Sequence, residues 1–103
     1  MSTILLSISI IMKIENSRQA NKRFVAIFSD GTRVNFGQKG GSTYIDGNRS
    51  EKERQNYISR HDVRENFNNP KTAGSLSRWI LWGDSKSLNK NHNDYMKKFK
   101  NLI

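Results

Sequence analysis

The chain has 103 residues and carries 18 Lys and Arg against 9 Asp and Glu, which gives a net charge of +9 and a sequence pI near 10.2. This length fits one small domain, and the absence of cysteine excludes a disulfide framework, a thiolate nucleophile and a cysteine-based zinc site. Hydrophobic residues make up 34% of the chain and aromatic residues 10%, so we expect a folded domain with a modest core.

The positive charge is spread along the chain. The first 48 residues contain six Lys and Arg and three Asp and Glu, and the remaining residues contain 12 and six. The excess therefore predicts a basic folded surface and not a basic arm. Such a surface is typical of proteins that bind nucleic acid or another acidic polymer.

An apolar segment, Thr3 to Met12, opens the chain. It is too short to cross a bilayer, which takes roughly twenty residues. It also lacks the basic start of a signal peptide, and charged residues follow it. Alternation along Leu6–Ile10 predicts an edge strand. The alternative is that Met12 is the functional start.

The polar composition of residues 13–22 predicts a linker. We therefore divide the chain into residues 1–21, an apolar N-terminal segment with a polar linker, and residues 22–103, a single small basic domain.

A β-hairpin is the firmest structural prediction. Residues 23–29 are rich in aromatic and β-branched side chains, residues 32–36 alternate, and Asp30-Gly31 between them is a dipeptide that favours positive φ in tight turns. The side chains predicted to face the core are Phe24, Ala26, Phe28, Val34 and Phe36. The glycine-rich segment 37–42 lacks the spacing of a phosphate-binding or dinucleotide-binding loop and is interpreted as a turn.

Three helices are expected after the hairpin. Ser50 and Glu53 form the pattern of a capping box, which predicts a helix over 51–66, ended by Asn68-Asn69-Pro70. Residues 73–82 predict a core helix on which Ala73, Leu76 and Ile80 share a face, with Gly83 as a left-handed cap. From Ser87 a last helix carries an apolar stripe that includes Tyr95 and Phe99 and runs to Leu102. The predicted fold class is α+β, a hairpin that the N-terminal segment can extend to three strands, packed against about three short helices.

His61 is the residue that most suggests catalysis or metal binding, because Asp62 and Glu65 lie close to it in sequence. Asp62 points about 100° away from His61 on a helix, and no spacing typical of zinc enzymes is present. A half-buried His61 that joins two elements is the preferred interpretation. We expect no catalytic residue, metal site, cofactor or small-molecule substrate, and so no enzyme.

The candidate nucleic-acid-binding residues combine cations with an aromatic ring. They are Arg60, Arg64, Arg78, Lys97, Lys98 and Trp82. Arginine pairs with phosphate in a fork and stacks on aromatic rings, whereas salt bridges of the three arginines to Glu53, Glu65 or Asp62 are an equal alternative. Trp82, at the end of its helix, is a candidate platform for stacked bases, and Trp79 is assigned to the core.

Several short motifs resemble a family of small basic proteins encoded by nucleocytoplasmic large DNA viruses of algae and protists. The motifs are Phe36-Gly37, Tyr44-Ile45-Asp46, Tyr57-Ile58-Ser59-Arg60-His61, Arg64-Glu65-Asn66 and the run from Ala73 to Trp82. The resemblance covers roughly residues 22–85, with Phe67 where a tryptophan is expected. It implies a viral origin and a virion role, and it transfers no catalytic residue.

The expected function is that of a sequence-nonspecific nucleic-acid-binding or genome-packaging protein of a large DNA virus, with DNA as the partner. The alternative is a minor capsid or virion structural protein whose basic surface binds an acidic virion protein. Either role places the protein in the virion or in the host cell interior, in the cytoplasm or a virus factory. We expect no membrane partner.

Overall fold

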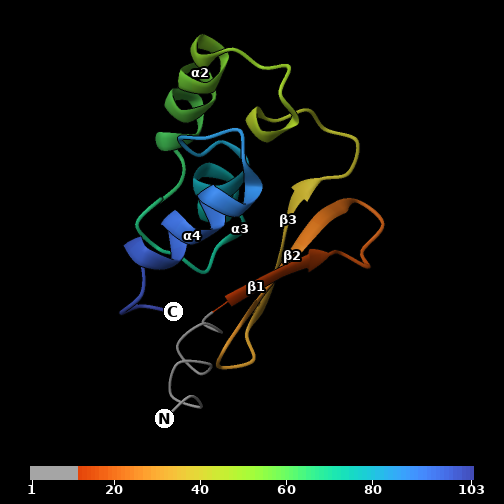
Figure 1. Ribbon diagram of the computed structural model, residues 1–103, viewed down its shortest axis with the longest axis vertical. Helices are drawn as coiled ribbons and strands as arrows, with labels where there is room; N and C mark the ends of the chain where they lie inside the picture. Colours follow the sequence, from red (N-terminus) through yellow and green to blue (C-terminus); the bar gives the residue numbers. More distant parts are fainter. Residues whose placement is uncertain (1–11) are drawn as a thin grey trace.

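A computed structural model describes residues 12–103, and it has the predicted α+β fold (Figure 1). The strands β1 (Met12–Asn16), β2 (Lys22–Phe28) and β3 (Arg33–Gln38) form one antiparallel sheet in the order β1-β2-β3. The helical elements are η1 (Tyr44–Asp46), α2 (Glu51–Asp62), α3 (Ala73–Leu76), η2 (Ser77–Leu81) and α4 (Leu88–Lys98). In Figure 1 the helices α2, α3 and α4 lie to one side of the sheet.

The predicted hairpin is present as β2 and β3, with Phe24 opposite Phe36. Its turn differs in detail from the expectation. The Phe28 N–H donates to the carbonyl of Thr32, and the Gly31 N–H donates to the carbonyl of Phe28. Gly31 has a φ of 91°, while no described residue other than glycine has a positive φ. The connection is therefore a three-residue loop with glycine at its left-handed position, and not a two-residue turn with two positive φ angles.

The linker prediction is wrong for its first residues, because Met12–Asn16 is the edge strand β1. Met12 is 3% exposed and Ile14 packs against the core, whereas Lys13 and Glu15 between them are exposed. Charged residues on the outer face are usual in an edge strand, and they gave this segment its polar composition. The edge strand predicted at Leu6–Ile10 lies outside the described residues.

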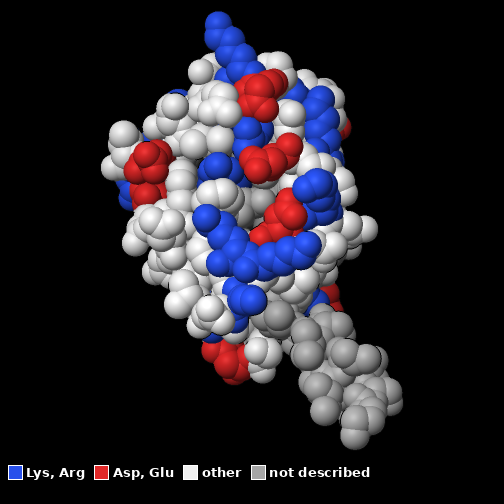
Figure 2. Space-filling model, turned by 60° about the vertical axis from the view of Figure 1, so that its left-hand side comes forward, with Lys and Arg blue, Asp and Glu red and all other residues white. Residues whose placement is uncertain are grey.

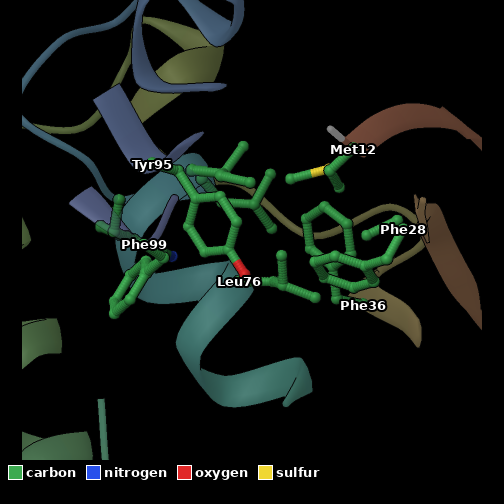
Figure 3. Packing of buried hydrophobic residues seen from close by; sticks show 10 residues of the cluster. Met12, Phe28, Phe36, Leu76, Tyr95 and Phe99 are labelled. Atoms are coloured by element: carbon green, nitrogen blue, oxygen red, sulfur yellow. The ribbon is translucent and has the colours of Figure 1, made fainter. Parts of the chain in front are cut away.

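The core forms where the sheet meets α3, η2 and α4. Figure 3 shows Met12, Phe28 and Phe36 from the strands facing Leu76, Tyr95 and Phe99 from the helices. Phe36 and Leu76 are fully buried, as is Ile80. The hydroxyl of Tyr95 donates to the carbonyl of Pro70 at 2.6 Å, so this buried polar atom has its partner.

The capping box at the start of α2 is confirmed. The Glu53 N–H donates to the Ser50 hydroxyl, and the Ser50 N–H donates to the Glu53 carboxylate. The helix ends at Asp62, four residues before the predicted end. Beyond it, the N–H groups of Arg64 and Glu65 both donate to the carbonyl of His61, which closes the last turn.

Residues 73–81 form one continuous helical segment in which α3 passes into a π-helical stretch, η2. The Trp82 N–H donates to the carbonyl of Ser77, five residues earlier, as in a π-turn. The prediction of a left-handed Gly83 is wrong, because the positive φ angles of the described glycines are at other positions. A Cβ at Gly83 would lie 2.4 Å from the carbonyl oxygen of Trp79, so glycine is needed there for close packing.

Helix α4 begins as predicted, since the Ser87 hydroxyl accepts from the N–H of Lys90. Tyr95 in the helix and Phe99 directly after its last residue are both buried. The predicted stripe is wrong at its end, because Leu102 is 61% exposed. The helix ends at Lys98, and the chain turns before Leu102 can reach the core.

The glycine-rich segment makes turns, as predicted. Gly37 and Gly40 have φ angles of 77° and 82°, and the Gly41 N–H donates to the carbonyl of Gln38. A Cβ on Gly37 would also come within 3.0 Å of the Leu81 side chain, so this glycine lets β3 lie close to η2.

Candidate functional site

The ion pairs of the structure leave most of the positive charge without a carboxylate partner. Among residues 12–103, which contain all 18 Lys and Arg, six cations form the ion pairs. These six are Lys13, Arg23, Arg49, Arg54, Lys71 and Lys90. The acids show the reverse pattern, because every described Asp and Glu except Asp62 and Glu65 is paired.

The five candidate cations all belong to the group without a carboxylate partner. The alternative of salt bridges from Arg60, Arg64 and Arg78 to Glu53, Glu65 or Asp62 is therefore wrong for the described residues. Glu53 is instead paired with Arg49 at 2.8 Å.

Arg60 and Arg64 lie near the end of α2. Arg60 is in the last turn of the helix, whereas Arg64 lies beyond the end of the helix. Both side chains are exposed. The helix end brings them next to the carbonyl groups of the last turn, where cations are favoured.

Arg78 and Lys98 come together on the ring of Trp79. The guanidinium carbon of Arg78 lies 4.0 Å from the ring centroid, and Nζ of Lys98 lies 4.6 Å from it. The ring N–H donates to the carbonyl of Phe67 at 2.9 Å, which fixes the ring in place. Lys97 is the exposed neighbour of Lys98 in α4. Trp79 packs against the core as predicted, but the two cations over its ring were not predicted from the sequence.

Burial lowers the pKa of Arg78 from its ordinary value, and the like charge of Arg54 lowers it further. Arg78 donates one hydrogen bond to the carbonyl of Trp82, at 3.3 Å. The guanidinium is therefore half-buried beside another cation, where an anionic ligand would stabilise it.

Trp82 is not available as a platform for bases, and this part of the sequence prediction is wrong. It is 8% exposed and belongs to the core. The ring of Tyr57 stacks on it at 4.3 Å with an interplanar angle of 6°, and His61 stacks on Tyr57 at 4.0 Å. The three rings join α2 to the end of η2.

Arg54 is a structural residue that sequence reasoning missed. It is 6% exposed, and its Nε donates to the carbonyls of Trp82 and Gly83. Its other nitrogens pair with Glu51 and Asp84. Because all its partners belong to the protein, Arg54 holds α2 to the end of η2 and is not a free cation.

His61 is half-buried, as expected, but it does not join two elements by a hydrogen bond. Its Nδ1 lies 2.9 Å from the carbonyl oxygen of Tyr57, one turn earlier in the same helix. A carbonyl oxygen only accepts, so Nδ1 is the donor in this contact. His92 is the histidine that joins elements, since its Nε2 contacts the carbonyl of Met12 in β1 at 2.9 Å. Within the described residues, no group of three His, Cys, Asp or Glu side chains is placed to hold a metal ion.

A cleft of about 500 Å³ lies between the sheet and the helices. Its walls come from the loop before β2, the end of β3, α2, α3 and the start of η2. The residues that line it are Asn21, Lys22, Gly37, Gln38, Tyr57, His61, Glu65, Ala73, Gly74 and Ser77. Burial, followed by the charge of Glu65, raises the pKa of the Tyr57 hydroxyl to about 12.

The basic side chains are also visible on the surface. On the face that Figure 2 shows, the blue area of Lys and Arg is widest just below the middle of the view, and acidic side chains interrupt it above. Within residues 12–103, no helix is both long enough and apolar enough to cross a membrane.

Comparison with known proteins gives one match. Residues 12–61, a little less than half of the chain, match the model of a family described as "Family of unknown function (DUF5754)". The matched region runs from β1 to the last turn of α2. No curated protein matches the chain, and no solved structure matches it. Over its first half the described chain is thus similar to a family whose function is unknown.

Proposed function

We propose that the protein binds nucleic acid through its phosphates, as a sequence-nonspecific DNA-binding or genome-packaging protein. The observation that carries the proposal is the number of cations without an ion pair: in residues 12–103, 12 of the 18 Lys and Arg have no carboxylate partner. Free cations of this kind neutralise phosphates and release the counterions that had condensed on the DNA.

The cluster around Trp79 is the part of the surface best arranged for a phosphate. Arg78 and Lys98 both approach the ring of Trp79, and neither of them forms an ion pair. An anion beside Arg78 would offset the desolvation and the like charge of Arg54, which lower the pKa of Arg78. Lys97 adds a third cation at the adjoining position of α4.

The origin in a large DNA virus rests on the resemblance of the sequence motifs to proteins of such viruses. Under this proposal the protein acts without catalysis, in the virion or the infected host cell. A basic surface packed against DNA inside a particle explains the high net charge of so small a chain.

A salt titration against random-sequence duplex DNA tests the proposal. If about six phosphates are neutralised, the affinity falls on the order of a thousandfold between about 50 mM and about 200 mM salt. The sequence of the duplex has little effect, because phosphates carry no base identity. Binding that does not change with salt would exclude this function and favour a capsid protein with an acidic protein partner. Cleavage of the DNA that requires a divalent metal would contradict the non-catalytic role.

A further inference from the structure

The strand β1 forms one edge of the sheet. The strand order is β1-β2-β3, and within residues 12–103 the only strand that pairs with β1 is β2. An unpaired strand edge presents N–H and C=O groups that can bond to a further strand. β1 is therefore a surface on which another strand can add to the sheet.

Alternate residues of β1 turn their backbone groups toward this open edge. The Ser17 N–H donates to the carbonyl of Arg23, which fixes the phase of the ladder between β1 and β2. Residues that bond across an antiparallel ladder alternate along each strand, so the odd-numbered residues of β1 bond to β2. The N–H and C=O groups of the even-numbered residues point outward, and these residues are Met12, Ile14 and Asn16.

The position of His92 supports this direction. Its Nε2 lies 2.9 Å from the carbonyl oxygen of Met12, which it can reach from α4 because that oxygen points away from β2. Among the described residues, no comparable contact is made to the backbone of Ile14 or Asn16. Most of the outward groups of β1 thus remain open to a partner strand.

The exposed face of β1 carries one charge of each sign. The side chains of Lys13 and Glu15 are 59% and 52% exposed. If a second copy of β1 lies antiparallel and is centred on Ile14, all five residues overlap, and each Lys13 lies opposite Glu15 of the second copy. The two neighbouring registers that also pair outward groups overlap fewer residues, and they put Lys13 opposite Lys13 or Glu15 opposite Glu15. Opposite charges stabilise such a cross-strand pair and like charges destabilise it, so the charges select the register centred on Ile14.

We propose that the protein forms a homodimer in which the β1 strands of two copies pair antiparallel about Ile14, so that two three-stranded sheets join into one. The N–H of each Ile14 donates to the carbonyl of the other, and the N–H of each Met12 donates to the carbonyl of Asn16 in the second copy. The carbonyl of Met12 keeps its contact with His92. This inference does not depend on the proposed nucleic-acid binding.

The side chains fit this arrangement on both faces of the sheet. Ile14 is half-buried and packs against the core, and the two Ile14 side chains meet on that face. On the other face, Lys13 and Glu15 of the second copy form a non-hydrogen-bonded pair, in which the Cα atoms are only about 4.5 Å apart. Because β1 has five residues, the interface is smaller than that of a stable complex, and we expect a weak dimer with a Kd on the order of 100 µM.

Sedimentation equilibrium of the unmodified protein tests the dimer. We expect the mass to rise from 11.9 kDa toward twice that value between about 10 µM and about 1 mM protein. About 150 mM salt screens the repulsion between two chains of net charge +9. A mass that stays at 11.9 kDa over the whole range would overturn the inference.

Charge variants test the register. Lys13→Glu and Glu15→Lys each bring like charges opposite one another, so each weakens its own dimer about tenfold. An equal mixture of the two variants restores the wild-type affinity, because opposite charges then meet again. The matched control Lys52→Glu makes the same change in net charge as Lys13→Glu at an exposed site in α2, and it leaves the dimer intact. Net charge alone predicts the opposite for Lys13→Glu, since fewer positive charges reduce the repulsion.

Cysteine cross-linking measures the same register without charge pairing. The chain has no cysteine, so Lys13→Cys and Glu15→Cys each introduce a single thiol. Oxidation of the mixture links the two variants at least tenfold faster than either variant links to itself, because the opposed Cα atoms, about 4.5 Å apart, suit a disulfide.

Two further results would overturn the inference. A dimer that survives Lys13→Glu in a folded protein would show that the copies associate through another surface. Cross-linking of one variant to itself as fast as in the mixture would show a different register. These measurements contain no DNA, so their failure leaves the proposed function to its own salt titration.

Discussion

Asn91 holds the start of α4 to the segment that follows η2, and its replacement by alanine tests the packing of the helical half. The side chain is 1% exposed and makes three hydrogen bonds. Its amide donates to the carbonyls of Ile80 at 2.9 Å and Ser85 at 2.7 Å, and its oxygen accepts from the Ser85 N–H at 3.1 Å.

The expected loss of stability follows from these three bonds. Each contributes about 1 kcal/mol net, and removal leaves buried backbone groups without a partner, so we expect Asn91→Ala to lose about 3 kcal/mol. A typical small domain has about 5–15 kcal/mol in total, so the loss is a large share. Asn91→Asp keeps the shape but places a carboxylate against two carbonyl oxygens, and it is at least as destabilising.

Equilibrium unfolding in urea, followed by circular dichroism, measures the difference. Asn93→Ala is the matched control, because Asn93 is exposed on the same helix and its replacement brings the same change in helix propensity. The difference between the two variants isolates the buried bonds. A free energy of unfolding for Asn91→Ala within about 0.5 kcal/mol of that of Asn93→Ala would refute the reasoning.

Three further predictions concern the turn, the stacked histidine and alkaline pH. Gly31→Val destabilises the domain by about 1–3 kcal/mol in thermal unfolding, because a β-branched residue is strained at a φ of 91°. No atom lies within 4 Å of the added Cβ, so the loss comes from the backbone alone, and unchanged melting would contradict this. His61→Gln leaves the affinity for duplex DNA within a few-fold of wild type in fluorescence anisotropy, because the His61 ring packs on Tyr57 and forms its hydrogen bond within its own helix. Stoichiometric zinc that is bound by the wild type and lost in this variant would show a metal role instead. The pKa of Tyr57 is raised to about 12 from 10.0, so its contribution to stability is complete below about pH 10 and is lost as the pH rises toward 12. Unfolding of wild type and Tyr57→Phe between those pH values measures it, and an equal pH dependence of the two proteins would contradict the assignment.

The sequence predicted best those elements whose signals are local. The capping pattern at Ser50 and Glu53 fixed the start of α2, and Gly31 marked the hairpin turn. The alternation of Phe24 and Ala26 along β2 identified the sheet face that contacts the helices. In each case the signal lies within a few residues of the feature that it predicts.

The features that were missed depend on contacts between distant parts of the chain. β1 is a strand because it pairs with β2 and buries Met12, and its exposed charges conceal this in the sequence. Gly83 is required by the approach of Asn91 and Trp79 and not by its own φ, which no local pattern reveals. Leu102 continues the helical spacing, but the helix ends before it.

The candidate cations were identified from composition and position, but their environments were not. Whether Arg78 pairs with an acid or stays free depends on where all the acids lie, and the sequence left both open. Trp79 packs against the core as predicted and also carries two cations on its ring, whereas Trp82, the candidate platform for bases, is stacked inside the core. Glu65 was considered only as a partner for arginine or a metal. Its place over Gly74 requires the loop between α2 and α3 to fold back, which residue spacing does not show.

The salt dependence of duplex DNA binding by a Lys97→Glu/Lys98→Glu protein tests the central claim most directly. The matched control is Arg33→Glu/Lys39→Glu, which makes the same change in net charge with two exposed, unpaired cations on β3 and the loop after it. If α4 supplies phosphate contacts, the Lys97→Glu/Lys98→Glu protein binds every DNA sequence more weakly, and its slope of log Kd against log salt concentration falls by about two. The control protein keeps a slope near that of wild type. An equal effect of the two variants, or wild-type binding by a folded Lys97→Glu/Lys98→Glu protein, would contradict the account.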